Sequence, residues 1–263
     1  ENEKNIKEIE NEKIILWINN KKKEINMIYV IKKEIISSKL IAYYLYLLQN
    51  FYFELGLPKN KIRFRKLKDE EKAFYAKEAW DFEVLTSVGW LELVACNHRG
   101  DYDLKEHQKL SKQKMEIVDE KTNEKVLPNV FELSLGIDRT IYSIMELTYK
   151  EDKKNDRTFF TFKPIIAPVQ VAIFPLVNKD KLPEKAQEVY NLLKSCYDCF
   201  YDSSGSIGRR YRRQDEIGTP FCITTDNQTL KDKTVTVRER DSMKQERVKI
   251  SELQAVLWKK IFG

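Results

Sequence analysis

Cysteine and histidine are scarce in this 263-residue sequence, and their scarcity excludes several kinds of site. Four cysteines without repeated spacing do not suit a disulfide framework and predict reduced thiols, as in a cytosol-like compartment. The two histidines, His98 and His107, lie near Cys96, but no spacing here matches a four-ligand zinc site. We therefore expect no structural metal.

Targeting and membrane segments are missing as well. The chain begins at Glu1, and its start, rich in Lys, Glu and Asn, lacks the small-residue cleavage site of a signal peptide. Its most apolar stretch is interrupted by Gln49 and Asn50 and falls short of the ~20 residues that a bilayer requires. We expect a cytoplasmic chain without a membrane span, and the non-Met start favours a fragment or a processed chain.

What is present suits a soluble globular protein with room for two domains. Hydrophobic residues make up 42% of the sequence and charged residues 33%. The net charge is +6, and five of these six charges lie from Lys163 onward. This excess predicts an anionic partner for the C-terminal part.

Periodicity predicts the elements of the first part. A helix from Ser37 or Ser38 to Leu55 is apolar nearly all round, so it should lie in the core, and Gly56 and Pro58 end it. We also expect strands at 14–18, 61–65, 80–84 and 89–96, a short helix at 70–79 and a surface hairpin at 116–126.

The strand at 89–96 carries an unusual acid. Strict alternation would place Glu92 on one face with Trp90, Val94 and Cys96. An unpaired buried carboxylate is costly, so Glu92 either faces solvent or is functional, and we favour the functional interpretation.

Residues 128–139 form the central candidate site. A strand through Val130 and Leu133 is broken by Gly136 and followed by a helix. Glu132 and Ser134 share one strand face, and Arg139 at the helix start suits phosphate oxygens. The alternative for Arg139 is a salt bridge to Asp138 or a neighbour.

The second part predicts a small mixed sheet with helices on its faces. After an exposed connector at 149–157 come a strand at 168–177 and a helix from Pro183 that carries Cys196 and Cys199. A loop at 202–208, a helix at 209–216, strands at 221–225 and 234–240 and a helix from Ser251 follow.

Several of these segments resemble the glycyl-tRNA synthetases, class II aminoacyl-tRNA synthetases, in their archaeal/eukaryotic-like form. In the first part the similarity lies in Gly89–Glu92, Arg99, Asp101–Leu104 and the motif 3-like Pro128–Arg139. In the second part it lies in residues 205–211, 213–218 and 236–243. The resemblance extends from about residue 31 to the C-terminus.

This resemblance implies an α/β (α+β) fold in two domains. Residues 1–157 would form part of an antiparallel class II catalytic sheet with helices, with motif 3 at 130–145. Residues 158–263 would form a mixed-sheet α/β anticodon-binding domain. Neither motif 1 nor motif 2 is found in residues 1–30, so we expect a C-terminal portion of a synthetase, or a member that has lost activity.

The implied function is glycine–tRNA ligase, which makes glycyl-adenylate from glycine and ATP and transfers glycine to tRNA(Gly). Glu92, Glu132 and Ser134 would bind glycine, with Leu133 where the family usually has Pro. Two carboxylates suit an ammonium whose charge offsets their repulsion. Arg139 would hold the γ-phosphate of ATP, which Mg²⁺ accompanies, and is the candidate catalytic residue.

Other arginines complete the expected site. Arg99 would bind ATP or the substrate carboxylate, with pairing to Asp101 or Asp103 as the alternative. The full-length protein would be a homodimer. The expected tRNA contacts, with Tyr211 as a stacking face, are Arg209, Arg210, Arg212, Arg213, Arg238 and Arg240.

Two other functions stay open. One is a non-catalytic nucleic-acid-binding relative of the synthetases, similar to the accessory subunit of mitochondrial DNA polymerase. The other is a basic α/β binding module with an unrelated partner. The joint presence of Glu92, Glu132, Ser134 and Arg139 favours the ligase, since a pure binding protein has no use for them.

Overall fold

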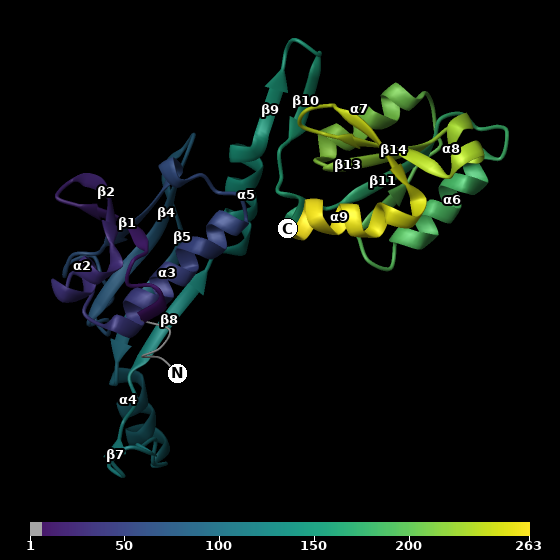
Figure 1. Ribbon diagram of the computed structural model, residues 1–263. Helices are drawn as coiled ribbons and strands as arrows, with labels where there is room; N and C mark the ends of the chain where they lie inside the picture. The colour runs from purple at the N-terminus through teal and green to yellow at the C-terminus, as the bar shows by residue number, and fades with distance from the viewer. Residues whose placement is uncertain (1–6) are drawn as a thin grey trace. The chain divides into compact units, whose positions relative to one another are not determined.

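The computed structural model describes residues 7–263, which form two compact units (Figure 1). The first unit ends at Ser143, and the second comprises Ile144–Gly263. Helix α5 (Ile137–Thr148) contains the division. The predicted boundary between residues 157 and 158 lies within strand β10 of the second unit.

A six-stranded sheet forms the centre of the first unit, in the order β2-β1-β3-β4-β5-β8. All neighbours are antiparallel except β1 and β3, which are parallel. The strands are β1 (Lys13–Ile18), β2 (Lys21–Asn26), β3 (Ile62–Lys66), β4 (Glu78–Thr86), β5 (Gly89–Gly100) and β8 (Val130–Leu135).

Helix α3 (Lys39–Glu54) covers one face of this sheet (Figure 1). Ser38 caps it by accepting a hydrogen bond from the Leu40 amide at 3.2 Å, as its sequence predicts. Tyr52 on α3 stacks on Phe82 of β4 with ring centroids 4.6 Å apart, and Phe82 contacts Phe64 of β3. The apolar face of the sheet is therefore the α3 face. The predicted helix is confirmed, but only one of its sides is in the core, because Leu40, Tyr44, Leu47 and Phe51 are exposed.

The remaining elements of this unit are α2 (Met27–Lys32), α4 (Tyr102–Ser111) and the hairpin of β6 (Ile117–Val118) and β7 (Lys125–Val126). The hairpin confirms the prediction for 116–126, whereas the predicted helix at 70–79 is wrong. Most of those residues form turns, the last two begin β4, and the Lys77 amide donates to the His98 carbonyl at 2.8 Å. Pairing with β5 thus overrides the local helical pattern.

The second unit holds a five-stranded sheet in the order β12-β11-β13-β14-β15. The first three strands are parallel and the last two antiparallel, which confirms the mixed sheet. The strands are β11 (Val171–Pro175), β12 (Cys199–Tyr201), β13 (Phe221–Thr225), β14 (Thr234–Glu239) and β15 (Gln245–Lys249).

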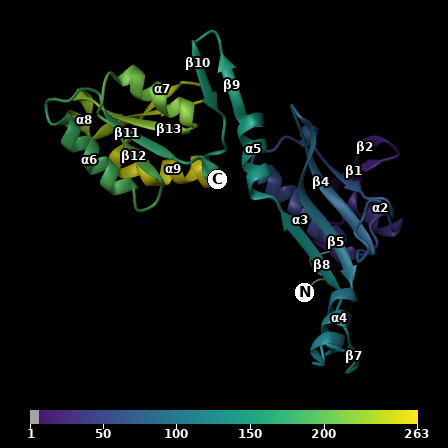
Figure 2. The same ribbon diagram turned by 180° about the vertical axis from the view of Figure 1, so that it is seen from behind.

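Helices cover both faces of this second sheet (Figures 1 and 2). Helices α6 (Leu182–Leu193) and α9 (Leu253–Phe262) bury their apolar sides in one core. Helix α7 (Ile207–Ile217) lies on the other face, where Tyr211 packs on Phe174. A short helix, α8 (Asn227–Asp232), links β13 to β14.

The predicted helix from Pro183 was expected to carry Cys196 and Cys199, but both lie outside the observed helix α6. Helix α6 ends at Leu193, so Cys196 lies in a turn and Cys199 begins β12. All four cysteines are free. Among residues 7–263 no group of three or more acidic, His or Cys side chains suits a metal, and no helix is long and apolar enough to cross a membrane.

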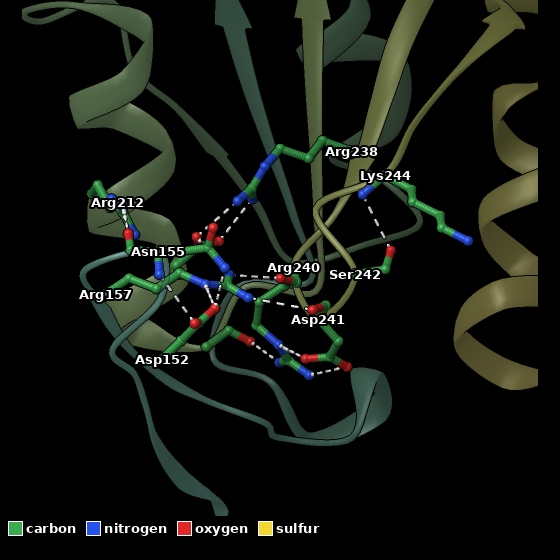
Figure 3. A network of polar contacts seen from close by, with 11 residues as sticks. Asp152, Asn155, Arg157, Arg212, Arg238, Arg240, Asp241, Ser242 and Lys244 are labelled. Atoms are coloured by element: carbon green, nitrogen blue, oxygen red, sulfur yellow. Dashed lines mark hydrogen bonds and ion pairs between the residues drawn. The ribbon is translucent and has the colours of Figure 1, made fainter.

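The charged segment at 149–157 is mostly exposed, as predicted, but it is not a mere connector. It forms most of a hairpin, β9 (Tyr149–Asp152) and β10 (Arg157–Phe160), whose Arg157 and Phe159 are buried. Arg157 donates to the Asp215 carboxylate at 3.0 Å and to the Arg240 carbonyl at 2.8 Å (Figure 3). The burial of Arg157 was not predicted because, apart from Asp152, its partners Asp215 and Arg240 lie more than fifty residues away in sequence.

Candidate active site and nucleic-acid interface

The first sheet turns a polar face away from α3. On this face, residues directly opposite each other on neighbouring strands form a line that we call the Ala95 row. The row comprises Arg65 (β3), Asp81 (β4), Ala95 (β5) and Ser134 (β8). Because side chains alternate along a strand, Glu83 and Glu132 lie on this same face.

Glu92 reaches the polar face through an irregularity in β5. Phe82 pairs with Val94, but the next residue, Glu83, pairs with Glu92, so Leu93 is an extra residue in the ladder. Such a bulge moves the side chains before it to the other face. The predicted common face for Glu92, Val94 and Cys96 is therefore wrong. Val94 and Cys96 are buried, whereas 44% of the Glu92 side chain is exposed.

Strand β8 places the predicted Glu132 and Ser134 together on the polar face. Ser134 pairs with Ala95 and Glu132 with Asn97. The Glu132 carboxylate accepts a hydrogen bond from Arg99 Nη1 at 2.8 Å. Ser134 is exposed, so its hydroxyl is available to a ligand.

Arg99 makes the predicted alternative pairing and one further contact. Its Nε and Nη2 donate to Asp103 at 2.6 and 2.7 Å, and its guanidinium lies 4.0 Å from the ring centroid of Tyr75. The hydrogen bonds from Arg99 lower the pKa of Asp103 below its usual value. Asp101 pairs with Lys105 instead, at 2.6 Å.

Arg139 lies in the first turn of α5, after the turn at Gly136. Its Nη1 donates to the Glu92 carbonyl at 3.0 Å and lies 3.8 Å from the Glu92 carboxylate. Half of the Arg139 side chain is exposed, at 54%. Glu92 is therefore its ion-pair partner, and the expected alternative partner, Asp138, is not.

The two predicted glycine carboxylates lie at opposite ends of the polar face. Asn97, which pairs with Glu132, follows Glu92 by five positions on β5. At ~3.3 Å per residue this separates the two backbones by roughly 15 Å. Glu132 thus lies with Arg99, and Glu92 with Arg139. A ligand that contacts both carboxylates has to be elongated.

In the second unit, three of the predicted RNA-binding arginines are buried. Arg210, 2% exposed, donates to backbone carbonyls that include those of Pro175 and Gly205. Arg238 and Arg240 are also buried, and Arg238 forms two bonds to Asp215, at 2.8 and 2.9 Å. These three side chains are thus held inside the fold and are not available for phosphate contacts.

Tyr211 is not a free stacking face either. Its ring packs on Phe174, the guanidinium of Arg238 lies 4.8 Å from its centroid, and its hydroxyl contacts the Thr224 hydroxyl at 2.6 Å. Burial raises the pKa of Tyr211 above its usual value. The ring is part of the core between α7 and the sheet.

The other three predicted arginines lie at or near the surface of α7. Arg209 is exposed, and Arg213 donates to the Asp202 carboxylate and, at 2.8 Å, to the Ser204 carbonyl, with 45% of its side chain exposed. Arg212 is half-buried and donates to the Asn155 carbonyl. A basic surface therefore remains, smaller than the sequence predicts.

Comparison with known proteins identifies both parts of the chain. Residues 170–260 match the family model described as an anticodon binding domain. A glycine–tRNA ligase of Clostridium acetobutylicum is 46% identical over 215 residues, which covers 81% of this chain and 46% of that protein. One of Archaeoglobus fulgidus is 35% identical over 308 positions, covering 89% of this chain and 54% of that protein. The chain is a homologue of glycine–tRNA ligases.

This glycine–tRNA ligase homologue spans about half the length of the curated relatives that it matches. Its anticodon-binding domain match lies entirely within the second compact unit. The candidate site residues of the first unit lie outside this match.

The sequence prediction missed one residue of the polar face in this ligase homologue. Asp81 is 6% exposed and donates no proton, but its Oδ2 accepts a bond from Arg65 Nη2 at 3.0 Å. Burial, and then the nearby charge of Glu92, raise the pKa of Asp81 to about 6. The signal was present in the sequence, because Asp81 and Glu83 alternate with the apolar Trp80, Phe82 and Val84.

Proposed function

We propose that this chain supplies part of a cytoplasmic, homodimeric glycine–tRNA ligase. In the first step, a glycine carboxylate oxygen attacks the α-phosphorus of ATP and pyrophosphate leaves, which gives glycyl-adenylate. In the second, the terminal ribose hydroxyl of tRNA(Gly) attacks the glycyl carbonyl and AMP leaves. Both steps depend mainly on positioning and charge stabilisation.

The observation that carries this proposal is the elongated polar face with different chemistry at its two ends. At one end Ser134 and Glu132 offer a hydroxyl and a carboxylate, which suit an ammonium. At the other end Arg139 offers a half-exposed guanidinium at a helix start, which suits phosphate. An aminoacyl-adenylate is elongated and has these two groups at a distance from each other.

The remaining site residues fit this orientation. Arg99 is held beside Glu132, where it would meet the amino-acid carboxylate or the nucleotide. Glu92, which the sequence assigns to glycine, lies nearer to Arg139 and therefore to the phosphate end. Mg²⁺ binds mostly to nucleotide phosphates and water, with one or two carboxylates. The exposed carboxylate of Glu92 suits that role, and the ion would neutralise phosphate charge.

The proposal is tested by glycine-dependent exchange of pyrophosphate into ATP. The assay uses the full-length ligase, by which we mean a polypeptide of the relatives' length that contains this chain. We expect exchange with glycine and none with L-alanine or L-serine. Absence of exchange with every amino acid would favour the non-catalytic nucleic-acid-binding alternative.

The second unit is proposed to bind the anticodon region of tRNA(Gly) through α7. We predict that Arg209→Ala combined with Arg213→Ala weakens tRNA binding to the 263-residue chain about tenfold. The slope of log affinity against log salt concentration should fall by the amount that roughly two phosphate contacts contribute. Filter binding at salt concentrations of roughly 50 to 200 mM measures both the affinity and its salt dependence.

Lys259→Ala is the matched control, because Lys259 is exposed on α9, on the other face of the same sheet. Equal weakening by this variant would show a diffuse charge effect. Unchanged affinity in the double arginine variant at low salt would refute the assignment of α7.

A further inference from the structure

Ala95 is the one small residue of its row and has larger polar neighbours on both sides. Asp81 lies opposite it on β4, and Ser134 lies opposite it on β8. Directly opposite side chains in an antiparallel pair have Cβ atoms about 4.5–5.5 Å apart. Ala95 therefore has the shortest side chain of the row, and we call the space above its methyl group the niche.

Asp81 has a free acceptor beside this niche. Its Oδ2 is turned to Arg65 on the β3 side, while its Oδ1 accepts no hydrogen bond from the described residues. Among residues 7–263, the completely buried side-chain nitrogen or oxygen atom that lacks a hydrogen-bond partner is Arg210 Nε. Asp81 Oδ1 also lacks a partner, so it is not completely buried. Oδ1 is therefore the oxygen of Asp81 that stays available to a ligand on the polar face.

Burial makes a charge at this position costly. Asp81 is 6% exposed, and Glu92 adds repulsion that raises its pKa further. If Asp81 served only to link β4 to β3 through its bond to Arg65, its second carboxylate oxygen would not need to stay without a partner. A carboxylate whose charge is destabilised by burial, at one residue of a candidate site, is typical of a group that binds a ligand.

We propose that the niche over Ala95 binds the ammonium group of the amino-acid substrate, with Asp81 as a direct ligand beside Ser134. The assignment rests on the proposed ligase function. It adds a residue to Glu132 and Ser134, and it makes Ala95 the residue that sets the depth of the niche. Ammonium has three donors, which Asp81 Oδ1, Ser134 Oγ and a further carboxylate such as Glu132 satisfy.

The chain offers a matched control in Glu83. Glu83 is also 6% exposed, lies on the same face of the same strand and accepts a bond from Arg65, at 3.0 Å. Glu83 pairs with Glu92, however, and lies one row away from Ala95. Asp81→Asn and Glu83→Gln both weaken an ion pair with Arg65, and Glu83→Gln also weakens the pair with Arg63, at 2.5 Å. Only Asp81→Asn removes a charge beside Ala95.

The test measures KM values for glycine and for ATP in the exchange assay of the full-length ligase. Asp81→Asn is expected to raise KM for glycine at least tenfold and to change KM for ATP less than twofold. Glu83→Gln is expected to leave KM for glycine within twofold. Ala95→Val, which fills the niche, is expected to raise KM for glycine as Asp81→Asn does.

Folding of the variants is checked by thermal unfolding at pH 7.5. Because the pKa of Asp81 is raised from 3.8 to about 6, its stability contribution is full below pH ~4 and lost as the pH rises through 6. Removing the charge should therefore leave the Tm of Asp81→Asn equal to or above that of the wild type.

If the wild type shows glycine-dependent exchange, two results would overturn the inference about Asp81 and leave the proposed function intact. One is an unchanged KM for glycine in Asp81→Asn. The other is an equal rise in Glu83→Gln, which would reduce Asp81 to a structural partner of Arg65. A wild type that exchanges with no amino acid would overturn the proposed function, and this inference with it.

Discussion

Replacing Arg139 with alanine in the full-length ligase should lower kcat/KM for glycine-dependent exchange by about 10²–10³, an effect typical of losing one preorganised charge-stabilising group. Arg139 is the exposed cation at the phosphate end of the polar face, and its Nη1 is held by the Glu92 carbonyl at 3.0 Å. The guanidinium is therefore positioned before the nucleotide arrives, so little reorganisation is needed at the moment of reaction.

Arg139→Lys separates charge from geometry. Lysine keeps a positive charge but loses the planar fork that binds phosphate oxygens in pairs, so we expect only partial recovery of exchange. Lys125→Ala removes an exposed cation from the β6–β7 hairpin and should leave exchange unchanged. The affinity for tRNA, measured in parallel, should be the same for all variants.

Loss of tRNA affinity in Arg139→Ala with exchange retained would reverse the assignment. It would place Arg139 in an RNA interface and leave the polar face without a phosphate group. A variant that keeps both activities would leave Arg139 as a structural partner of Glu92, and the proposed orientation of the adenylate would be lost.

The sequence predicts the strands that carry apolar runs or alternation, but it misses three strands at the sheet edges, β2, β12 and β15. It cannot predict the bulge at Leu93, which exists only in the pairing of β5 with β4. That single residue decides whether Glu92 faces the core or the polar face. The functional interpretation of Glu92 came chiefly from the family resemblance, while the face assigned to it by alternation was wrong.

The arginines of α7 illustrate a second limit. Only Ile207 and Tyr211 form an apolar contact on the buried side of this helix, and the rest of that side is polar. The structure shows Arg210, Gln214 and Asp215 to be buried. Their burial depends on carbonyls and side chains from distant segments, which periodicity within α7 cannot reveal. The number of basic residues therefore overstates the surface available to RNA.

Asp215→Ala is expected to destabilise the second unit by about 3–5 kcal/mol, the cost typical of breaking a buried ion pair. Asp215 is 0% exposed and binds Arg157 of β10 and Arg238 of β14 (Figure 3). Its removal leaves the buried Arg238 without a carboxylate and leaves the buried Arg157 with Asp152 alone. Urea unfolding of the 263-residue chain, followed by fluorescence, measures the loss.

Asp202→Ala is the control for this prediction. Asp202 pairs with Arg213, whose side chain is 45% exposed, so water can replace the contact and the expected cost is about 0–1 kcal/mol. Equal effects of the two variants would show that burial of the Asp215 pairs contributes little. A large effect confined to Asp215→Ala would show that this one carboxylate fixes the β9–β10 hairpin to the sheet. The long-range contacts of Arg157, which its charged local sequence did not predict, would then be a main source of stability in the anticodon-binding unit.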